Sequence, residues 1–443
     1  MFFKEIYLQN FRRFPEFVMD FHPELTVIAA RNGQGKTSVL EAIAAAMGPF
    51  VGAFDAGKGE HIRRSDARYS VVDGGYQNEQ NFPVVIAAEL ERADEDTLQW
   101  QRRLNSPKGK TTIKEAAPLA SWGRDLQSAL RVRADVKLPV VCYYSSKRLW
   151  VSHKNTSTKA RLTGSRTVGY EDCLSSMSSF TQLQTWMKDA NYAAVQQRQR
   201  GDEDTDLQHH IRVIASAVDS VMSSEGWFGF HYSFEHQELA MSHAEHGPLP
   251  ISMLSDGVRA MISLIADLAL RSVRLNGHLG ESATKETPGI VLIDEVDLHL
   301  HPAWQQQVLH GLRNAFPRIQ FIVSTHSPQV LSTVSRENIR VVYQDSQGAW
   351  KSVCPSEEVK GLESQIALSE VMGVDPVPPL EESRWLAEYM AKIESGSHED
   401  ARANELRKQL EAIYGEAHRI LRDADRLIRF QAMRHRRARE QGE

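Results

Sequence analysis

The sequence predicts an α/β protein with a mostly parallel sheet covered by helices. Near the start of the chain, an apolar strand over 24–30 leads into a glycine-rich loop and then into an alanine-rich helix. In the second half, a helix over 257–275 precedes a buried strand at 290–294. A helix near 303–315 then leads to another buried strand, at 319–328. Strands that alternate with helices in this way are typical of parallel sheets.

Composition and charge narrow the class of protein. The chain has 443 residues, of which 41% are hydrophobic and 25% charged, which is ordinary globular usage. A formal net charge of −5 means that any surface for nucleic acid must be local. The three cysteines have no CxxC spacing and favour neither a disulfide framework nor a cysteine zinc site. No apolar run is long enough for a membrane span, and the start MFFKEIYLQNFRRF carries charges where a secretory signal should be apolar, so we expect a cytoplasmic protein with no membrane partner.

The first third of the chain is expected to be mainly β with loops. Its strand candidates are rich in β-branched and aromatic residues and lie at 2–9, 83–90, 97–104 and 138–144. Helical spacing of apolar residues then predicts an inserted helical subdomain over 145–223. Strand signals return at 227–232 and 238–243, and a loop is expected at 276–288. From about residue 376 only helices are predicted, at 382–393, 399–414 and 417–438.

Residues 30–37, ARNGQGKT, match a phosphate-binding loop in which Ala30 replaces the first glycine. The two glycines let backbone N–H groups curl around a phosphate at a helix N-terminus. Lys36 is expected to reach the β- and γ-phosphates, and Thr37 to bind Mg²⁺. The predicted nucleotide-binding residues here are Asn32, Gly33, Gly35, Lys36, Thr37 and Ser38. The alternative is a glycine-rich turn between strand and helix without a ligand.

An acidic pair follows the apolar strand IVLI at 290–293. In a P-loop enzyme Asp294 would hold the Mg²⁺ shell, and Glu295 would polarise the attacking water as the catalytic base. The alternative is a buried strand that ends in a solvated acidic pair.

Two further motifs flank that acidic pair. Ser255 and Gly257, in the LSDG at a helix start, can offer hydroxyl and N–H donors to a γ-phosphate. His326, in the STHS that ends another apolar strand, is the candidate catalytic switch histidine. Its alternative is a histidine that caps a strand end.

The four motifs in this order are the set that ATP-binding-cassette (ABC) ATPases use. The stretches LPISMLSDGVRAMISLIADLALR and PGIVLIDEVDLHLHPAWQQQVLHGLRNAFPRIQFIVSTHSPQVL, with the opening IYLQNFRRF, resemble the RecF/SMC-like branch of that class. Within the branch they are most similar to the ATPase subunit of the Septu anti-phage defence system. The resemblance covers about 1–50 and 225–345.

The resemblance implies a P-loop NTPase fold of the ABC-ATPase head type, with a β-rich N-terminal lobe. Residues 1–144 and 224–375 would form the head, with the P-loop in the first part and the signature, Walker B strand and switch histidine in the second. Residues 145–223 would be a helical insertion, and 376–443 a helical region for assembly and partner docking.

The resemblance also implies a function. Mg²⁺-dependent ATP hydrolysis would take place between head-to-tail subunits of a homodimer or higher homo-oligomer, because LSDG lies on the opposite edge of such folds from the P-loop. The ATP state would control a separate HNH-type nuclease subunit, and nucleic acid would be reached through that complex.

Two other functions remain open at this stage. One is a RecF-like DNA repair or recombination ATPase that binds DNA directly, and the other is the nucleotide-binding subunit of a transporter. Long coiled coils need sustained heptads, for which 145–223 has no room. Neither an H-N-H constellation nor a second βα series with an acidic triad is recognisable, so a nuclease would be another chain.

Several charged residues have two interpretations each. His299 and His301 could be a metal pair or part of an interface loop, and Arg259 and Asp297 could be structural or cross-interface contacts. The acid-free stretch 147–170 could contact phosphates or be a solvated loop. Its basic residues are Lys147, Arg148, Lys154, Lys159, Arg161 and Arg166. One face of the last helix carries Arg419, Arg422, Arg426 and Arg429, which favours docking on a neighbour over a free DNA arm.

Overall fold

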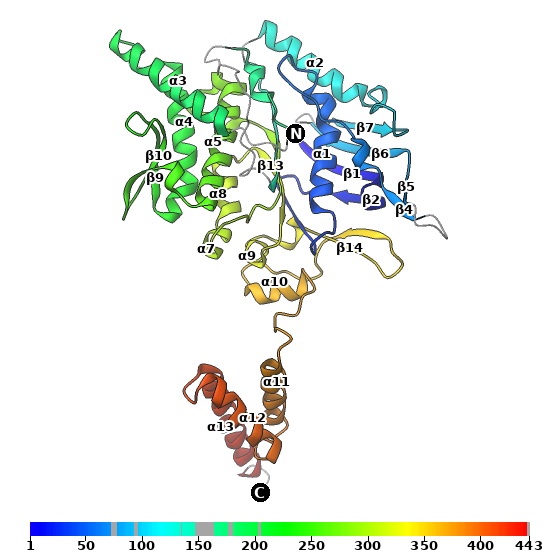
Figure 1. Cartoon of the computed structure of the whole chain (residues 1–443), viewed down its shortest axis with the longest axis vertical. Helices are drawn as coiled ribbons and strands as arrows, with labels where there is room; N and C mark the ends of the chain where they lie inside the picture. The colour runs from blue at the N-terminus through cyan, green and yellow to red at the C-terminus, as the bar shows by residue number, and fades with distance from the viewer. Residues whose placement is uncertain are drawn as a thin grey trace. The chain divides into compact units, whose positions relative to one another are not determined.

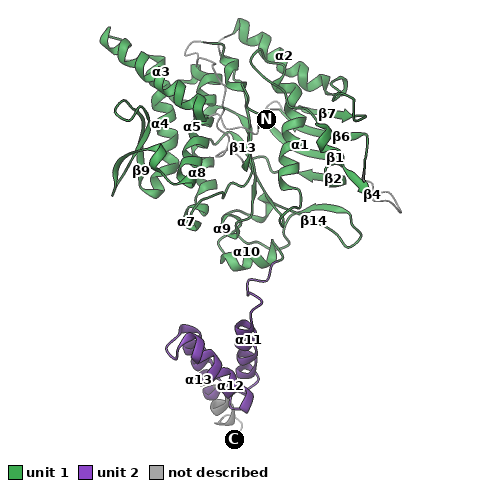
Figure 2. Ribbon diagram, viewed as in Figure 1, with its two compact units in different colours: residues 1–373 green, residues 374–443 purple. Residues whose placement is uncertain are grey.

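The computed structural model describes residues 1–71, 78–92, 96–133, 135–146, 164–175, 180–202 and 205–440. The chain divides into two compact units, residues 1–373 and 374–443 (Figure 2). Each unit has a hydrophobic core of its own. Among the described residues, no helix is both long and apolar enough to cross a membrane.

A six-stranded sheet forms the centre of the first unit, in the order β15-β14-β3-β13-β12-β8. Its strands are β3 (Leu25–Ala29), β8 (Val140–Tyr144), β12 (Gly289–Ile293), β13 (Ile319–Thr325), β14 (Ile339–Gln344) and β15 (Trp350–Val353). All neighbouring pairs are parallel except β14 with β15. Every residue of β3, β12 and β13 is buried, as expected for strands covered on both faces. The predicted α/β fold with a mostly parallel sheet is confirmed.

Helices cover this sheet on both sides. Figure 1 shows α1 on one side of β13 and α5 with α8 on the other. These helices are α1 (Lys36–Val51), α5 (Asp256–Asn276) and α8 (Val308–Ala315), with α7 (Pro302–Gln305) preceding α8 and α9 (Pro328–Leu331) following β13. Both α1 and α5 contact strands of this sheet, so packing fixes the helix starts that carry the predicted motifs.

A second, antiparallel sheet lies in the N-terminal part, in the order β2-β1-β6-β7. Its strands are β1 (Phe2–Phe11), β2 (Phe14–Asp20), β6 (Val84–Glu91) and β7 (Thr97–Leu104), and a separate short pair is β4 (Tyr69–Val71) with β5 (Asn78–Gln80). This part is mainly β, as expected, but it also holds an unforeseen helix, α2, which spans Ala117–Val132. Pro118 stands in the first turn of α2, and Leu119 and Gly123 are buried one turn apart.

Helices and a small sheet occupy the middle of the chain. The predicted insertion contributes the short helix η4 (Arg166–Tyr170), α3 (Phe180–Gln199) and α4 (Asp206–Met222). A three-stranded sheet of β9 (Trp227–Ser233), β10 (Glu238–His243) and β11 (Gly247–Pro250) follows. The segment expected as a loop at 276–288 is instead helical over Gly277–Ser282 and Ala283–Glu286.

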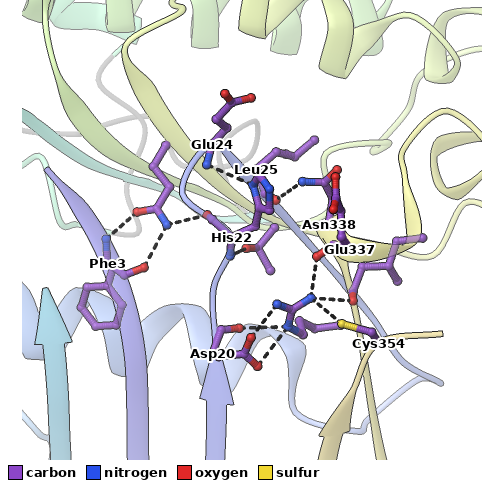
Figure 3. A network of polar contacts seen from close by, with 12 residues as sticks. Phe3, Asp20, His22, Glu24, Leu25, Glu337, Asn338 and Cys354 are labelled. Carbon is purple, nitrogen blue, oxygen red and sulfur yellow. Dashed lines mark hydrogen bonds and ion pairs between the residues drawn. The ribbon is translucent and has the colours of Figure 1, made fainter. Parts of the chain in front are cut away.

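Polar side chains join the two large sheets (Figure 3). Gln320 of β13 exchanges hydrogen bonds with the main chain of Phe3 in β1, at 2.7 and 2.9 Å. The buried guanidinium of Arg340 in β14 donates to the Asp20 carboxylate at the end of β2, at 2.6 Å. A buried charge is costly unless it is paired and hydrogen-bonded, so these bonds fix how the N-terminal sheet joins the central one.

The second unit is a set of three helices, α11 (Glu381–Glu394), α12 (Ala401–Tyr414) and α13 (Arg419–Glu440). Each lies within two residues of its predicted range at either end. Their contact surfaces are buried at Tyr389, Ile393, Ala403, Leu406, Leu410, Leu421 and Ala424. The short helix α10 (Ser364–Glu370) belongs to the first unit.

Candidate functional site

The P-loop connects the end of β3 to the start of α1. Gly33 and Gly35 have φ angles of +74° and +95°, a region that favours glycine. A Cβ on Gly35 would also lie 2.5 Å from the ring of Phe14. Ala30, in place of the motif's first glycine, is buried without a positive φ. The loop therefore has the left-handed glycines and the helix N-terminus that a phosphate cradle requires.

Asp294 lies where three motifs meet. It follows β12 directly and is 1% exposed. Its carboxylate accepts from the hydroxyl of Thr37 at 2.9 and 3.1 Å and from the hydroxyl of Ser324 at 2.6 Å. The carboxylate and the Thr37 hydroxyl are hard oxygen donors of the kind Mg²⁺ prefers, so the donor set fits that ion.

Lys36 and His326 form the other half of this site. Lys36 Nζ donates to the carbonyl oxygen of Ala30 at 2.9 Å and lies 3.4 Å from His326 Nδ1. Burial lowers the pKa of Lys36 to about 8, although Asp294 and other nearby carboxylates oppose the shift. Burial, and then the Lys36 charge, lower the pKa of His326. At neutral pH the pair is therefore an ammonium beside a neutral imidazole.

Glu295 begins the loop between β12 and α7. Its backbone has a φ of +50°, and its N–H donates to the Ser324 hydroxyl at 2.9 Å. His299, four residues on, has a φ of +60°. Left-handed conformations are costly for residues other than glycine and recur at functional sites. The loop is thus held in a specific shape directly beside Asp294.

The LSDG motif lies at the start of α5, where Ser255 is the N-cap. A Cβ on Gly257 would fall well inside the contact distance of the His299 carbonyl oxygen. This glycine therefore permits a close approach between the start of α5 and the Glu295 loop of the same chain. Within the part of the chain that the structure describes, Ser255 and Gly257 make no hydrogen bond to Lys36 or Thr37.

Four other residues that the sequence singled out are Asn32, Ser38, Asp297 and Arg259. Asn32 is exposed in the P-loop, and Ser38 is half-buried in the first turn of α1. Asp297 accepts from the Thr325 hydroxyl at 2.6 Å, and Arg259 pairs with Asp256 in its own helix turn. Both candidates for cross-interface contacts thus have partners in their own chain.

The proposed histidine pair does not form a metal cluster. His301 caps α7, accepting from the Ala303 N–H at 3.3 Å. Among the described residues, three potential metal ligands come together only at His243, Glu245 and His246, at the end of β10 and in the turn that follows. Within the described part of the chain, His299 and His301 therefore belong to no group of three potential ligands.

The basic stretch 147–170 lies largely outside the described residues, including Lys147, Arg148, Lys154, Lys159 and Arg161. Arg166 is described, and the expectation that it is solvated or contacts phosphate was wrong. Its guanidinium donates to the carbonyl oxygens of Leu275, at 2.7 Å, and Val136. These bonds attach η4 to the end of α5.

Two residues of this region were missed by the sequence reasoning. Ser324 was noted only as part of STHS, yet its hydroxyl joins Asp294 to the Glu295 backbone. Tyr144 ends β8, and its carbonyl oxygen accepts from the Asp294 N–H at 2.8 Å. Tyr144 could have been found from its position in the sequence, because it is the last residue of a buried strand, and that strand pairs with β12.

Comparisons with known proteins agree with this geometry. Residues 5–212 match the family "AAA domain", and residues 199–332 match "AAA domain, putative AbiEii toxin, Type IV TA system". The chain is 34% identical over 210 residues to "Retron Vc95 probable ATPase" of Vibrio cholerae serotype O1 biovar El Tor, covering 46% of this chain and 37% of that protein. It is 24% identical to "Retron Ec83 probable ATPase" of Escherichia coli, covering 90% of this chain and 81% of that protein.

A third relative is "Septu protein PtuA" of Bacillus mycoides (strain KBAB4), 39% identical over 94 residues, which are 21% of this chain and 12% of that protein. Among solved structures, an SMC head bound to the C-winged helix domain of ScpA aligns with a TM-score of 0.47 and 16% identity, covering 80% of this chain and 97% of that one. The chain thus spans little more than a third of the first relative named above.

Fold and motif order define the class: the chain has a P-loop fold like that of ABC-ATPase heads, and residues 5–212 and 199–332 match AAA-type ATPase domains. More particularly, its homologues include Septu PtuA and retron ATPases.

Proposed function

We propose that this chain is the ATPase subunit of an anti-phage defence complex, that it hydrolyses ATP between two head-to-tail copies, and that its ATP state controls a separate HNH-type nuclease. The observation that carries the ATPase part of this proposal is the convergence on Asp294. The hydroxyls of Thr37 in α1 and Ser324 in β13, more than 250 residues apart in sequence, both donate to this one carboxylate, which directly follows β12.

Each group has a role that follows from its chemistry. Thr37 and Asp294 would hold Mg²⁺, which when bound neutralises charge on the β- and γ-phosphates. Lys36 supplies a cation at the same phosphates. Glu295, beside the Mg²⁺ ligands, accepts the proton of the attacking water. His326, a neutral imidazole next to Lys36, can donate to or accept from the γ-phosphate and so reports its presence.

The proposal of a shared site rests on where LSDG lies. Gly257 lies against the His299 carbonyl oxygen of its own chain, and Ser255 caps the same helix start. Their hydroxyl and N–H donors suit a phosphate that a second copy brings. A head-to-tail dimer would then hold two equivalent sites, each with the P-loop of one copy and the LSDG of the other.

The nuclease part of the proposal rests on the relatives and on the second unit. Septu PtuA and retron ATPases are homologues of this chain, and residues 376–443 form helices with a core separate from the ATPase unit. α13 presents exposed arginines such as Arg419 and Arg426, together with exposed Phe430. Arginine and aromatic side chains on one surface are typical of protein interfaces.

Mixing two inactive variants tests the shared site. Lys36→Ala removes the P-loop cation, and Ser255→Ala removes the signature hydroxyl. In a mixed dimer one site carries both defects and the other carries neither, so an equimolar mixture should recover about a quarter of the wild-type rate.

The matched control mixes Lys36→Ala with Glu295→Gln. Both changes affect the site of their own P-loop, so each mixed dimer still has two damaged sites and no recovery is expected. Recovery in neither mixture, or an ATPase that stays monomeric with ATP at all concentrations, would refute the composite site.

A further inference from the structure

Tyr144 joins the Asp294 site to the helix that carries LSDG. Its main-chain oxygen accepts from the Asp294 N–H at 2.8 Å, and in the β8–β12 register it lies opposite Ile293. Its hydroxyl donates to Asp267 Oδ2 on α5, also at 2.8 Å. One residue thus contacts the Mg²⁺-site strand through its backbone and the signature helix through its side chain.

The α5 end of this connection is a buried ion pair. Asp267 and Arg271 lie one turn apart, with side chains 7% exposed, and Arg271 Nε is 2.8 Å from the carboxylate oxygen that Tyr144 also uses. Arg271 Nη1 donates further to the carbonyl oxygens of Gly169 and Glu171, at 2.8 and 2.9 Å. Because a buried charge that loses its partner is strongly destabilising, this pair has little freedom to rearrange.

The ion pair is well placed to orient LSDG. α5 runs without interruption from Asp256 to Asn276, so Asp267 lies about three turns from the Ser255 cap. A continuous, buried helix moves as one body. A shift of Asp267 therefore shifts Ser255 and Gly257 with it.

We propose that Tyr144 and Asp267 are positioning residues of the composite ATP site. Through their hydrogen bond, the arrangement of Asp294 in one site sets the orientation of α5, and with it the LSDG donors that serve the nucleotide of the second copy. This inference rests on the proposed function, since it assigns a role only if LSDG completes a site in another subunit.

Tyr144→Phe tests the inference, since it removes one hydroxyl and leaves Asp267 bonded to Arg271. The matched control is Tyr170→Phe. The Tyr170 hydroxyl is buried in the same part of the unit and donates to the Pro139 carbonyl oxygen at 2.7 Å, not to α5. Thermal melting should show that both variants fold.

The readouts are ATP affinity of dilute, monomeric protein and the ATP-dependent dimerisation constant by analytical ultracentrifugation, all in the Glu295→Gln background. Tyr144→Phe should keep ATP affinity within about twofold and weaken dimerisation about tenfold, the size expected for one hydrogen bond to a charged group. Tyr170→Phe should change both by less than about twofold.

A double-mutant cycle with Ser255→Ala separates positioning from general destabilisation. If Tyr144 acts through LSDG, Tyr144→Phe should weaken dimerisation by less than about twofold when Ser255 is already alanine. Full additivity, or equal dimerisation of the two phenylalanine variants, would overturn the inference while leaving the ATPase proposal intact. If Lys36→Ala still bound ATP, or ATP induced no dimer at all, the proposed function would fail, and this inference with it.

Discussion

The depressed pKa of Lys36 predicts a specific pH dependence of nucleotide binding. Phosphate oxygens bind the ammonium form, so they raise the pKa of Lys36 when nucleotide is bound. The ligand-free chain, with a Lys36 pKa of about 8, must take up a proton on binding at higher pH. The affinity is then divided by roughly 1 + 10^(pH − 8), a factor of about 1.1 at pH 7 and about 11 at pH 9. We expect about a tenfold loss of affinity across that range.

The contribution of Lys36 to folding stability depends on pH in the opposite direction to its contribution to nucleotide affinity. The folded pKa of Lys36 lies below the usual value of 10.5, so between about pH 8 and 10.5 the unfolded chain binds more protons than the folded one. In that window Lys36 makes stability rise with pH, the opposite sign to the loss of affinity. If Lys36 causes the loss of nucleotide affinity at pH 9, this residue should not also lower the thermal stability at that pH.

Calorimetric titration with Mg²⁺ and ADP, in two buffers of different ionisation enthalpy, measures affinity and proton uptake together. Uptake should be about 0.9 proton at pH 9 and about 0.1 at pH 7. Lys36→Arg is the control, because a guanidinium stays charged over this range and its pH dependence reports only the other groups. A His326→Gln background removes the neighbouring imidazole. Equal affinity at pH 7 and 9, with no uptake at pH 9, would refute the assignment of Lys36 to the phosphates.

Three further predictions follow from the site and the second unit. Glu295→Gln should keep ATP bound and lower phosphate release at least about 100-fold, and wild-type turnover would place the base elsewhere. Gly257→Ala should lower the free energy of unfolding in urea by about 1–3 kcal/mol, since the new Cβ meets the fixed His299 carbonyl oxygen, whereas an unchanged midpoint would show that the loop can move. Deleting 376–443 should leave nucleotide affinity unchanged but abolish partner association and protection from phage. If the truncated chain still co-purifies with its partner and protects cells, the docking surface lies in the first unit.

The fold of the ATPase unit could be predicted from the sequence because its strong signals are local. The strands that become β3, β12 and β13 are continuous apolar runs, and such runs are what a doubly covered parallel sheet requires. α2 was missed for the opposite reason: most of its residues are at least partly exposed, and only one narrow face, including Leu119 and Gly123, is buried. Its helical spacing is visible only when Pro118 is recognised as a helix start.

The same locality explains which parts of the site the sequence determined by itself. The P-loop, Asp294 and His326 each follow a parallel strand, and the carboxyl ends of parallel strands meet at one edge of a sheet, so their proximity follows from motif order. Three contacts were decided only by the tertiary structure. The Tyr144 hydroxyl donates to Asp267, and Gly257 lies against the His299 carbonyl oxygen. The Arg166 guanidinium donates to a carbonyl oxygen at the end of α5. Those contacts join segments about 40 to 125 residues apart in sequence. They depend on the position of α5 on the sheet to within a few ångströms, and no local pattern of residues encodes that position.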